Sequence, residues 1–177
     1  MLGMMYEEGS GIEKDEQQAF QWYWKGARMS HNFGAQYRVG LLYEEGRGVE
    51  QDYREACKWY EKAAENGSID AMLGLGRLYQ FGHGVAVNKE AALQWYLKVA
   101  QKSKDSAHEH LAEMYFNGEG TDKDIVEAWK WLLLAEEAGE KSIELRDKIE
   151  AEITAEQKTE AQCRADEFRK THTEGES

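Results

Sequence analysis

The chain of 177 residues contains no proline and only two cysteines, so its sharp turns fall to 17 glycines. Cys57 and Cys163 make neither a disulfide framework nor a zinc site. Basic residues are outnumbered: the chain has 22 Lys and Arg against 34 Asp and Glu, which gives a net charge of −12 at pH 7. This balance argues against a nucleic-acid binder, which needs clustered Lys and Arg. Apolar runs such as residues 131–135 are far too short for membrane insertion.

One pattern occurs four times along the sequence. It starts with a tyrosine at intervals of 37, 36 and 36 residues: Tyr6, Tyr43, Tyr79 and Tyr115. Three residues after each comes Gly-x-Gly: Gly9 and Gly11, Gly46 and Gly48, Gly82 and Gly84, Gly118 and Gly120. An Asp or Asn, an Ala and a Trp then follow at fixed spacing: Asp15, Ala19 and Trp22; Asp52, Ala56 and Trp59; Asn88, Ala92 and Trp95; Asp124, Ala128 and Trp131. The chain is therefore a repeat array.

Each copy predicts two antiparallel helices. Ala35, Val39, Leu42 and Tyr43 follow the spacing of one apolar helix face. The Gly-x-Gly pair ends this first helix, because glycine adopts the left-handed C-cap conformation without strain. The Asp or Asn is a good N-cap for the second helix. A residue inside the first helix is small in every copy (Gly3, Gly40, Gly76 and Ala112), which predicts the close approach of a neighbouring helix.

Residues 39–49 (VGLLYEEGRGV) and 56–64 (ACKWYEKAA) resemble the Sel1-like repeat family. The resemblance implies an all-α superhelix, or solenoid, related to tetratricopeptide repeats, with the first helices lining a concave face. Its repeats are expected at about 1–34, 35–70, 71–106 and 107–138. Residues 139–170 are expected to form a pair of capping helices, with Leu145, Ile149 and Ile153 on one face. Residues 171–177 are expected to be a flexible tail.

The face of the first helices opposite the core stripe is the candidate partner-binding surface. We expect it to combine exposed apolar anchors with charged groups, as interface hot spots do. Its members are Tyr37, Leu41, Glu44, Glu45, Leu73, Arg77, Gln80, Phe81, Glu109, Glu113 and Phe116. Such a surface suits a protein or peptide with basic and aromatic residues.

Glutamates in the last turn of two first helices favour a functional interpretation. Glu7-Glu8 and Glu44-Glu45 oppose the helix dipole there, at about 0.3–1 kcal/mol each. The alternative is that they are solvated charges of an acidic protein.

Catalytic interpretations have little support. Gly-x-Gly recurs at helix ends rather than after a strand, so it predicts turns and not a phosphate site. His108-Glu109-His110 suggests a metal, but residues two apart point to different helix faces. No cofactor is expected. A hydrolase site around His108, Glu109 and Glu113 is the weakest alternative.

The sequence therefore predicts a non-enzymatic interaction module that binds a partner segment on its concave face. The rival interpretation is structural: the first repeat stacks on a second copy, or the chain is a segment of a longer scaffold, because its register starts inside a repeat. The compartment stays open. A chain starting at Met1 would be cytoplasmic, whereas the resemblance to exported bacterial proteins implies the envelope or secretion if upstream sequence is missing.

Overall fold

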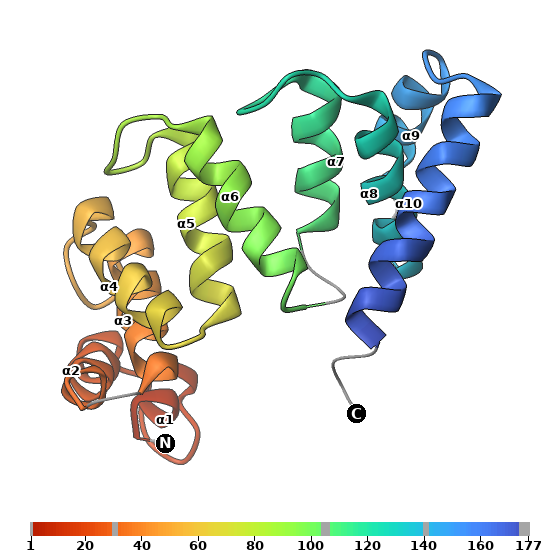
Figure 1. Cartoon of the computed structure of the whole chain (residues 1–177). Helices are drawn as coiled ribbons and strands as arrows, with labels where there is room; N and C mark the ends of the chain where they lie inside the picture. Colours follow the sequence, from red (N-terminus) through yellow and green to blue (C-terminus); the bar gives the residue numbers. More distant parts are fainter. Residues whose placement is uncertain (1, 30–31, 104–106, 140–141, 174–177) are drawn as a thin grey trace. The chain divides into compact units, whose positions relative to one another are not determined.

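A computed structural model describes residues 2–29, 32–103, 107–139 and 142–173. All regular structure in these ranges is α-helical, as the repeat pattern predicts. The chain forms two compact units, Met1–Val87 and Asn88–Ser177. Figure 1 shows the helices coloured along the sequence.

The first unit contains two complete helix pairs and the first helix of a third. Its helices are α1 (Leu2–Glu8), α2 (Glu16–Ala27), α3 (Phe33–Glu45), α4 (Tyr53–Glu65) and α5 (Ile69–Phe81). Each helix packs against the next one in the chain, as the repeat pattern requires.

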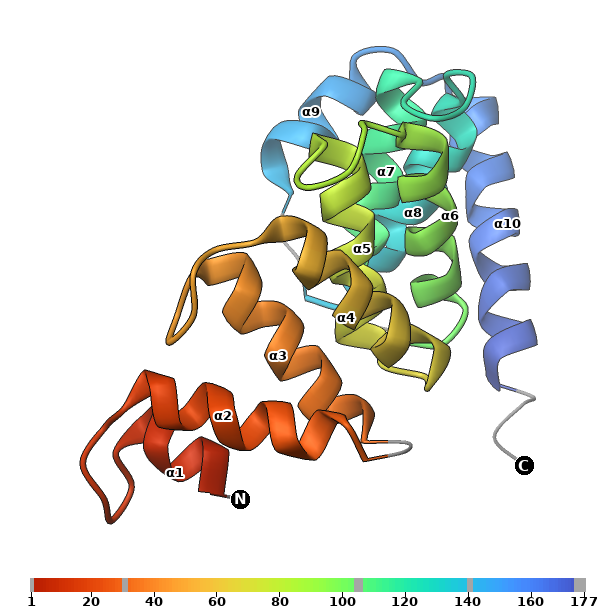
Figure 2. The same cartoon turned by 90° about the vertical axis from the view of Figure 1, so that its left-hand side faces the viewer.

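The second unit contains the rest of the repeats and the C-terminal helices. Its helices are α6 (Lys89–Ala100), α7 (His108–Asn117), α8 (Ile125–Glu137), α9 (Ile143–Glu150) and α10 (Ala155–Thr173). Helix α10 runs along α8, as Figure 2 shows. It continues into the segment expected to be flexible, whose residues 174–177 lie outside the described ranges.

The predicted helix caps are confirmed. Side chains of Asp15, Asp52, Asn88 and Asp124 each accept a hydrogen bond from a backbone N–H in the first turn of the following helix. The first glycines of three loops end α3, α5 and α7 with left-handed backbone, at φ values of 69°, 75° and 68°. The loops therefore have the conformations that their glycines predict.

The second glycine of each later loop touches the preceding repeat. A Cβ added to Gly48 would lie 2.0 Å from the carbonyl oxygen of Glu16, at the start of α2. Gly84 and Gly120 meet the starts of α4 and α6 in the same way, at 2.5 Å and 2.3 Å from backbone atoms. Any side chain at these positions would separate two neighbouring repeats, so glycine is required for contact as well as for its positive φ.

Tyr60 shows why small residues recur inside the first helices. Its ring is fully buried between α3 and α5. A Cβ added to Gly40 would lie 2.6 Å from Tyr60 Cδ1, and one added to Gly74 would lie 2.7 Å from Tyr60 Cε2. The predicted close approach is thus confirmed at Gly40, and it is an aromatic ring that approaches.

The C-terminal helices cover the last repeat. Ala161 and Ala165 of α10 are fully buried, and Phe168 packs edge-on against Trp131 of α8 with ring centroids 5.0 Å apart. Thr154 and Gln157 exchange side-chain-to-backbone hydrogen bonds at the start of α10, which forms a capping box. The small alanines let α10 lie close to α8.

Candidate partner-binding surfaces

The predicted surface of the first unit lies on α3 and α5. Leu41 and Leu73 are half-buried, whereas Phe81 is 61% exposed. Tyr37 is half-buried and stacks on Tyr60, with ring centroids 5.7 Å apart. Phe81 is therefore the apolar anchor with the most free surface, and Tyr37 also supports the core.

Glu44 has a structural role that its sequence position did not reveal. Its carboxylate accepts a hydrogen bond from the Tyr60 hydroxyl and lies 3.4 Å from the exposed Arg77 guanidinium. Burial, followed by the hydrogen bond to Glu44, raises the pKa of Tyr60. Tyr60 therefore stays a neutral donor, and the Glu44 carboxylate satisfies the polar end of a buried ring.

The same pair occurs one repeat earlier. The Tyr23 hydroxyl donates to Glu7 Oε2 at 2.7 Å, and Arg38 of α3 lies 3.5 Å from the Glu7 carboxylate. The glutamates that oppose the helix dipoles thus have partners inside the protein. This finding weakens the argument that they are retained for binding.

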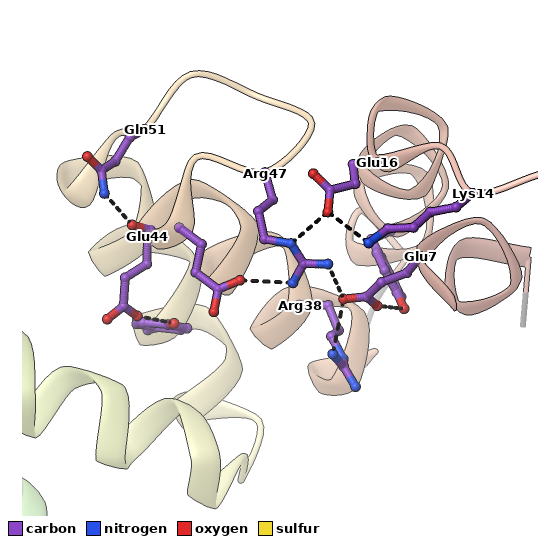
Figure 3. A network of polar contacts seen from close by, with 10 residues as sticks. Glu7, Lys14, Glu16, Arg38, Glu44, Arg47 and Gln51 are labelled. Carbon is purple, nitrogen blue, oxygen red and sulfur yellow. Dashed lines mark hydrogen bonds and ion pairs between the residues drawn. The ribbon is translucent and has the colours of Figure 1, made fainter. Parts of the chain in front are cut away.

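Arg47 connects two repeats of the first unit, as Figure 3 shows. This residue lies between the two loop glycines, and its guanidinium lies 3.3 Å from Glu7, 3.0 Å from Glu16 and 2.9 Å from Glu45. Sequence reasoning passed over Arg47 because this loop position differs in every repeat. The exposed Glu45, predicted as a binding residue, is one of its partners.

The last repeat replaces the Tyr–Glu pair by apolar residues. Leu132 occupies the tyrosine position and Phe116 the glutamate position; both are buried, and Lys123 lies over the Phe116 ring at 4.4 Å. The expectation that Phe116 is an exposed anchor is therefore wrong. In the third repeat the glutamate position holds Gln80, which is half-buried.

A hollow of about 330 Å³ lies between α7 and α9 in the second unit. Three predicted residues line it: Glu109, Glu113 and the edge of Phe116. Glu109 accepts a hydrogen bond from Ser142, and Ile143 at the rim is 68% exposed. The structure thus brings the predicted residues of the fourth repeat together, against a helix that the prediction had assigned only to capping.

Carboxylates dominate the charge of this hollow. Among the described residues that line it, Glu109, Glu113 and Glu144 are acidic and Lys148 is basic. Glu113 is exposed by its surface area, but neighbouring atoms partly desolvate its carboxylate, which raises its pKa. The negative charges of Glu109 and Glu119 raise this pKa further, whereas Lys148 lowers it. A cation placed in the hollow would stabilise the ionised Glu113.

The structure separates the residues of the hydrolase alternative. His108 is buried and stacks on Trp131 at a centroid distance of 5.6 Å, with Phe168 at its edge. Glu109 and Glu113 line the hollow instead. Across the described ranges, no three His, Cys, Asp or Glu side chains gather as a metal ion requires. No helix in the described part of the chain is long and apolar enough to cross a membrane.

Comparison with known proteins agrees with this architecture. The Sel1 repeat model matches residues 1–31, 34–68, 69–103 and 105–140. A Sel1 repeat protein from Oxalobacter formigenes has a similar structure, with a TM-score of 0.73 and 36% identity over 78% of this chain and 56% of that one. A protective antigen of uropathogenic Escherichia coli with the same type of fold has a TM-score of 0.80 and 31% identity.

The present chain covers only part of these relatives. The alignment with the Escherichia coli antigen takes in 98% of this chain but 37% of the antigen. A search of curated proteins found no match. Sel1 repeat proteins generally mediate protein–protein interactions and are typically non-catalytic. With four repeat matches that span most of its length, the chain belongs to the Sel1 repeat family.

Proposed function

We propose that the chain is a protein-binding module whose first helices hold a partner segment. The hollow between α7 and α9 carries this proposal, because it has the concave form and mixed lining of a binding site. Glu109 and Glu113 supply charge, and the exposed Ile143 supplies apolar contact at the rim.

The first unit offers a contact area of its own. Phe81 is exposed, Leu41 and Leu73 have partly free surfaces, and Arg77 lies among them on α5. Apolar anchors beside charged groups are the usual composition of interface hot spots.

The charges of the hollow favour a basic partner segment. The described residues that line it include three carboxylates and one amine, so a Lys or Arg side chain would find a negative potential beside them. Because ionisation of Glu113 is opposed by its surroundings, a bound cation would relieve that cost. An apolar neighbour in the partner would cover Ile143.

The proposal is tested by affinity capture from a lysate of the source cell. The test variant combines Glu113→Lys with Ile143→Lys, which changes the net charge of the described lining residues from −2 to +1 and removes the apolar side chain at the rim. Both side chains are exposed, so the fold should survive, as a circular dichroism melt would verify. Glu167→Lys on α10 is the matched control, since Glu167 is exposed and lies outside the hollow.

A protein held by the wild type and the control, but lost by the double variant, supports the proposal. Equal capture by all three proteins would show that the hollow is not the binding site. The earlier candidates Tyr37 and Arg77 are poorer test positions, because they contact Tyr60 and Glu44.

A further inference from the structure

Helix α10 shows how a helix docks on the second helix of a repeat. It lies along α8, the second helix of the fourth repeat, and α9 lies on a different side of α8 (Figure 2). Its apolar contacts come from Ala161 and Ala165, which are fully buried, and from Phe168, which packs against Trp131. The docked side of α10 is thus a stripe of small side chains with one aromatic ring.

Two arginines of α10 pair with carboxylates on the same side of α8. Arg164 Nη1 lies 2.8 Å from Glu127 Oε1 and 3.9 Å from Asp124 Oδ2. Arg169 Nε donates a hydrogen bond of 2.9 Å to the Glu137 carboxylate. The docked helix is therefore recognised by two arginines, five residues apart in its sequence, against acidic groups near both ends of α8.

The side chains that hold α10 recur at the same positions of α4, two repeats earlier. Asp124, Glu127, Lys130, Trp131 and Glu137 correspond to Asp52, Glu55, Lys58, Trp59 and Glu65. The sequences of α2 and α6 differ at these positions, which hold Asp15, Gln18, Gln21, Trp22 and Arg28 in the first repeat and Asn88, Ala91, Gln94, Trp95 and Gln101 in the third. We name the side of α4 that has these residues its outer face.

A Glu–Lys pair on this face has the same geometry in both helices. Lys58 Nζ lies 2.5 Å from Glu55 Oε1, and Lys130 Nζ lies 2.6 Å from Glu127 Oε2. The two pairs differ in exposure. The side chains of Lys58 and Glu55 are 63% and 36% exposed, whereas those of Lys130 and Glu127, beneath α10, are 11% and 17% exposed. The outer face of α4 thus has the arrangement that α8 uses, and it is open to solvent.

One position differs between the two faces. Leu134 of α8 is buried, whereas the equivalent residue of α4 is Lys62, which is exposed and lies over the Trp59 ring at 4.4 Å. The stem of a lysine can cover apolar surface while its amine stays in water. A helix therefore fits on α4 as well, with a weaker apolar contact than α10 has on α8.

We propose that the outer face of α4 binds a helix of a partner protein that has the pattern of α10. Two arginines of this helix, five residues apart, pair with Glu55 and Glu65. A stripe of alanines between them lies on the stems of Lys58 and Lys62. Because the chain's own α10 is docked on α8, another protein supplies the helix for α4. This surface lies on a second helix and is separate from the α7–α9 hollow.

A labelled peptide with the sequence of residues 155–173 tests the proposal by fluorescence anisotropy with the full chain. Cys163→Ser removes the thiol of the peptide. A second peptide has Arg164→Gln and Arg169→Gln as well. The first peptide should bind at least about fivefold tighter than the second, and this preference should fall as salt is raised.

Glu55→Gln with Glu65→Arg in the full chain is the test variant. The first repeat has Gln18 and Arg28 at these two positions, so the fold accepts both residues, as a circular dichroism melt would verify. This variant should bind the first peptide at least about fivefold more weakly and should lose the preference between the two peptides.

Two further variants complete the experiment. Glu8→Gln with Glu13→Arg changes the net charge equally at exposed positions outside α4, and should leave binding unchanged. Lys62→Leu gives α4 the residue that α8 has at Leu134, and should tighten binding at least about threefold.

Four results would overturn the proposal. These are failure of the first peptide to bind, equal binding of the two peptides, binding that Glu55→Gln with Glu65→Arg leaves unchanged, and binding that Lys62→Leu does not tighten. A mass that doubles with concentration in light scattering, and stays at the monomer value in Glu55→Gln with Glu65→Arg, would assign the outer face to α10 of a second copy and also overturn it. None of these results depends on the α7–α9 hollow.

Discussion

The close packing of the Tyr60 ring between Gly40 and Gly74 predicts that Gly40→Ala destabilises the protein. In an open helix this change raises stability by about 1 kcal/mol, because alanine has the higher helix propensity. Here the new methyl group would lie 2.6 and 2.7 Å from two atoms of the Tyr60 ring. The ring cannot move away, because Gly74 already approaches its other side closely.

Overpacking of a core by an extra methyl group costs about 1–3 kcal/mol. We expect this cost to exceed the free energy that alanine contributes through its higher helix propensity. We therefore expect Gly40→Ala to lower the free energy of unfolding by about 1–2 kcal/mol, measured by urea titration with circular dichroism. Gly34→Ala in the same helix is the matched control. Its Cβ meets open space, so it should be neutral or stabilising.

The fourth repeat suggests how the loss should be rescued. It has Ala112 at the glycine position and Leu132 at the tyrosine position, both fully buried. In a Tyr60→Leu background, Gly40→Ala should therefore cost nothing, with a coupling of about 2 kcal/mol between the two sites. If Gly40→Ala stabilises the wild type as much as Gly34→Ala does, the steric reasoning is refuted.

Two further predictions concern charged groups. Arg47→Ala should lower the free energy of unfolding by about 1 kcal/mol at low salt, and the difference should shrink at high salt because the lost contacts are partly exposed ion pairs; equal losses at both salt concentrations would contradict this. Glu113 has a pKa raised in the folded protein, so the native state holds its proton more tightly and this residue lowers stability as the pH rises through that range. Glu113→Gln should thus raise the melting temperature at pH 7 relative to the wild type. The difference should vanish at acidic pH, where Glu113 is protonated. A difference of equal size at acidic pH would exclude the ionisation of Glu113 as its cause.

Much of the fold could be predicted because its determinants are local. An Asp before a helix and a Gly after one act within a single turn, and a fixed interval of 36 or 37 residues identifies their repetition. The capping box of Thr154 and Gln157 is local in the same sense, because its two hydrogen bonds join residues three apart.

The roles of surface groups could not be predicted in this way, because they depend on contacts between helices. The sequence suggests that Glu44 is a solvated charge, whereas in the structure its carboxylate accepts a hydrogen bond from the Tyr60 hydroxyl, 16 residues later. One signal was available in the sequence: the glutamate and tyrosine positions change together in the fourth repeat, to Phe116 and Leu132. The joint change predicts that the two side chains of a repeat contact each other, and therefore that Phe116 packs inward toward Leu132.

The backbone contacts of Gly48, Gly84 and Gly120 have a consequence for how such a protein can change over time. Within each unit, the distance between neighbouring repeats is determined by main-chain atoms that are in contact without an intervening side chain. Substitutions on the exposed helix faces leave that distance unaltered. Mutation can therefore change the exposed side chains of a repeat while the distance between neighbouring repeats in a unit remains constant.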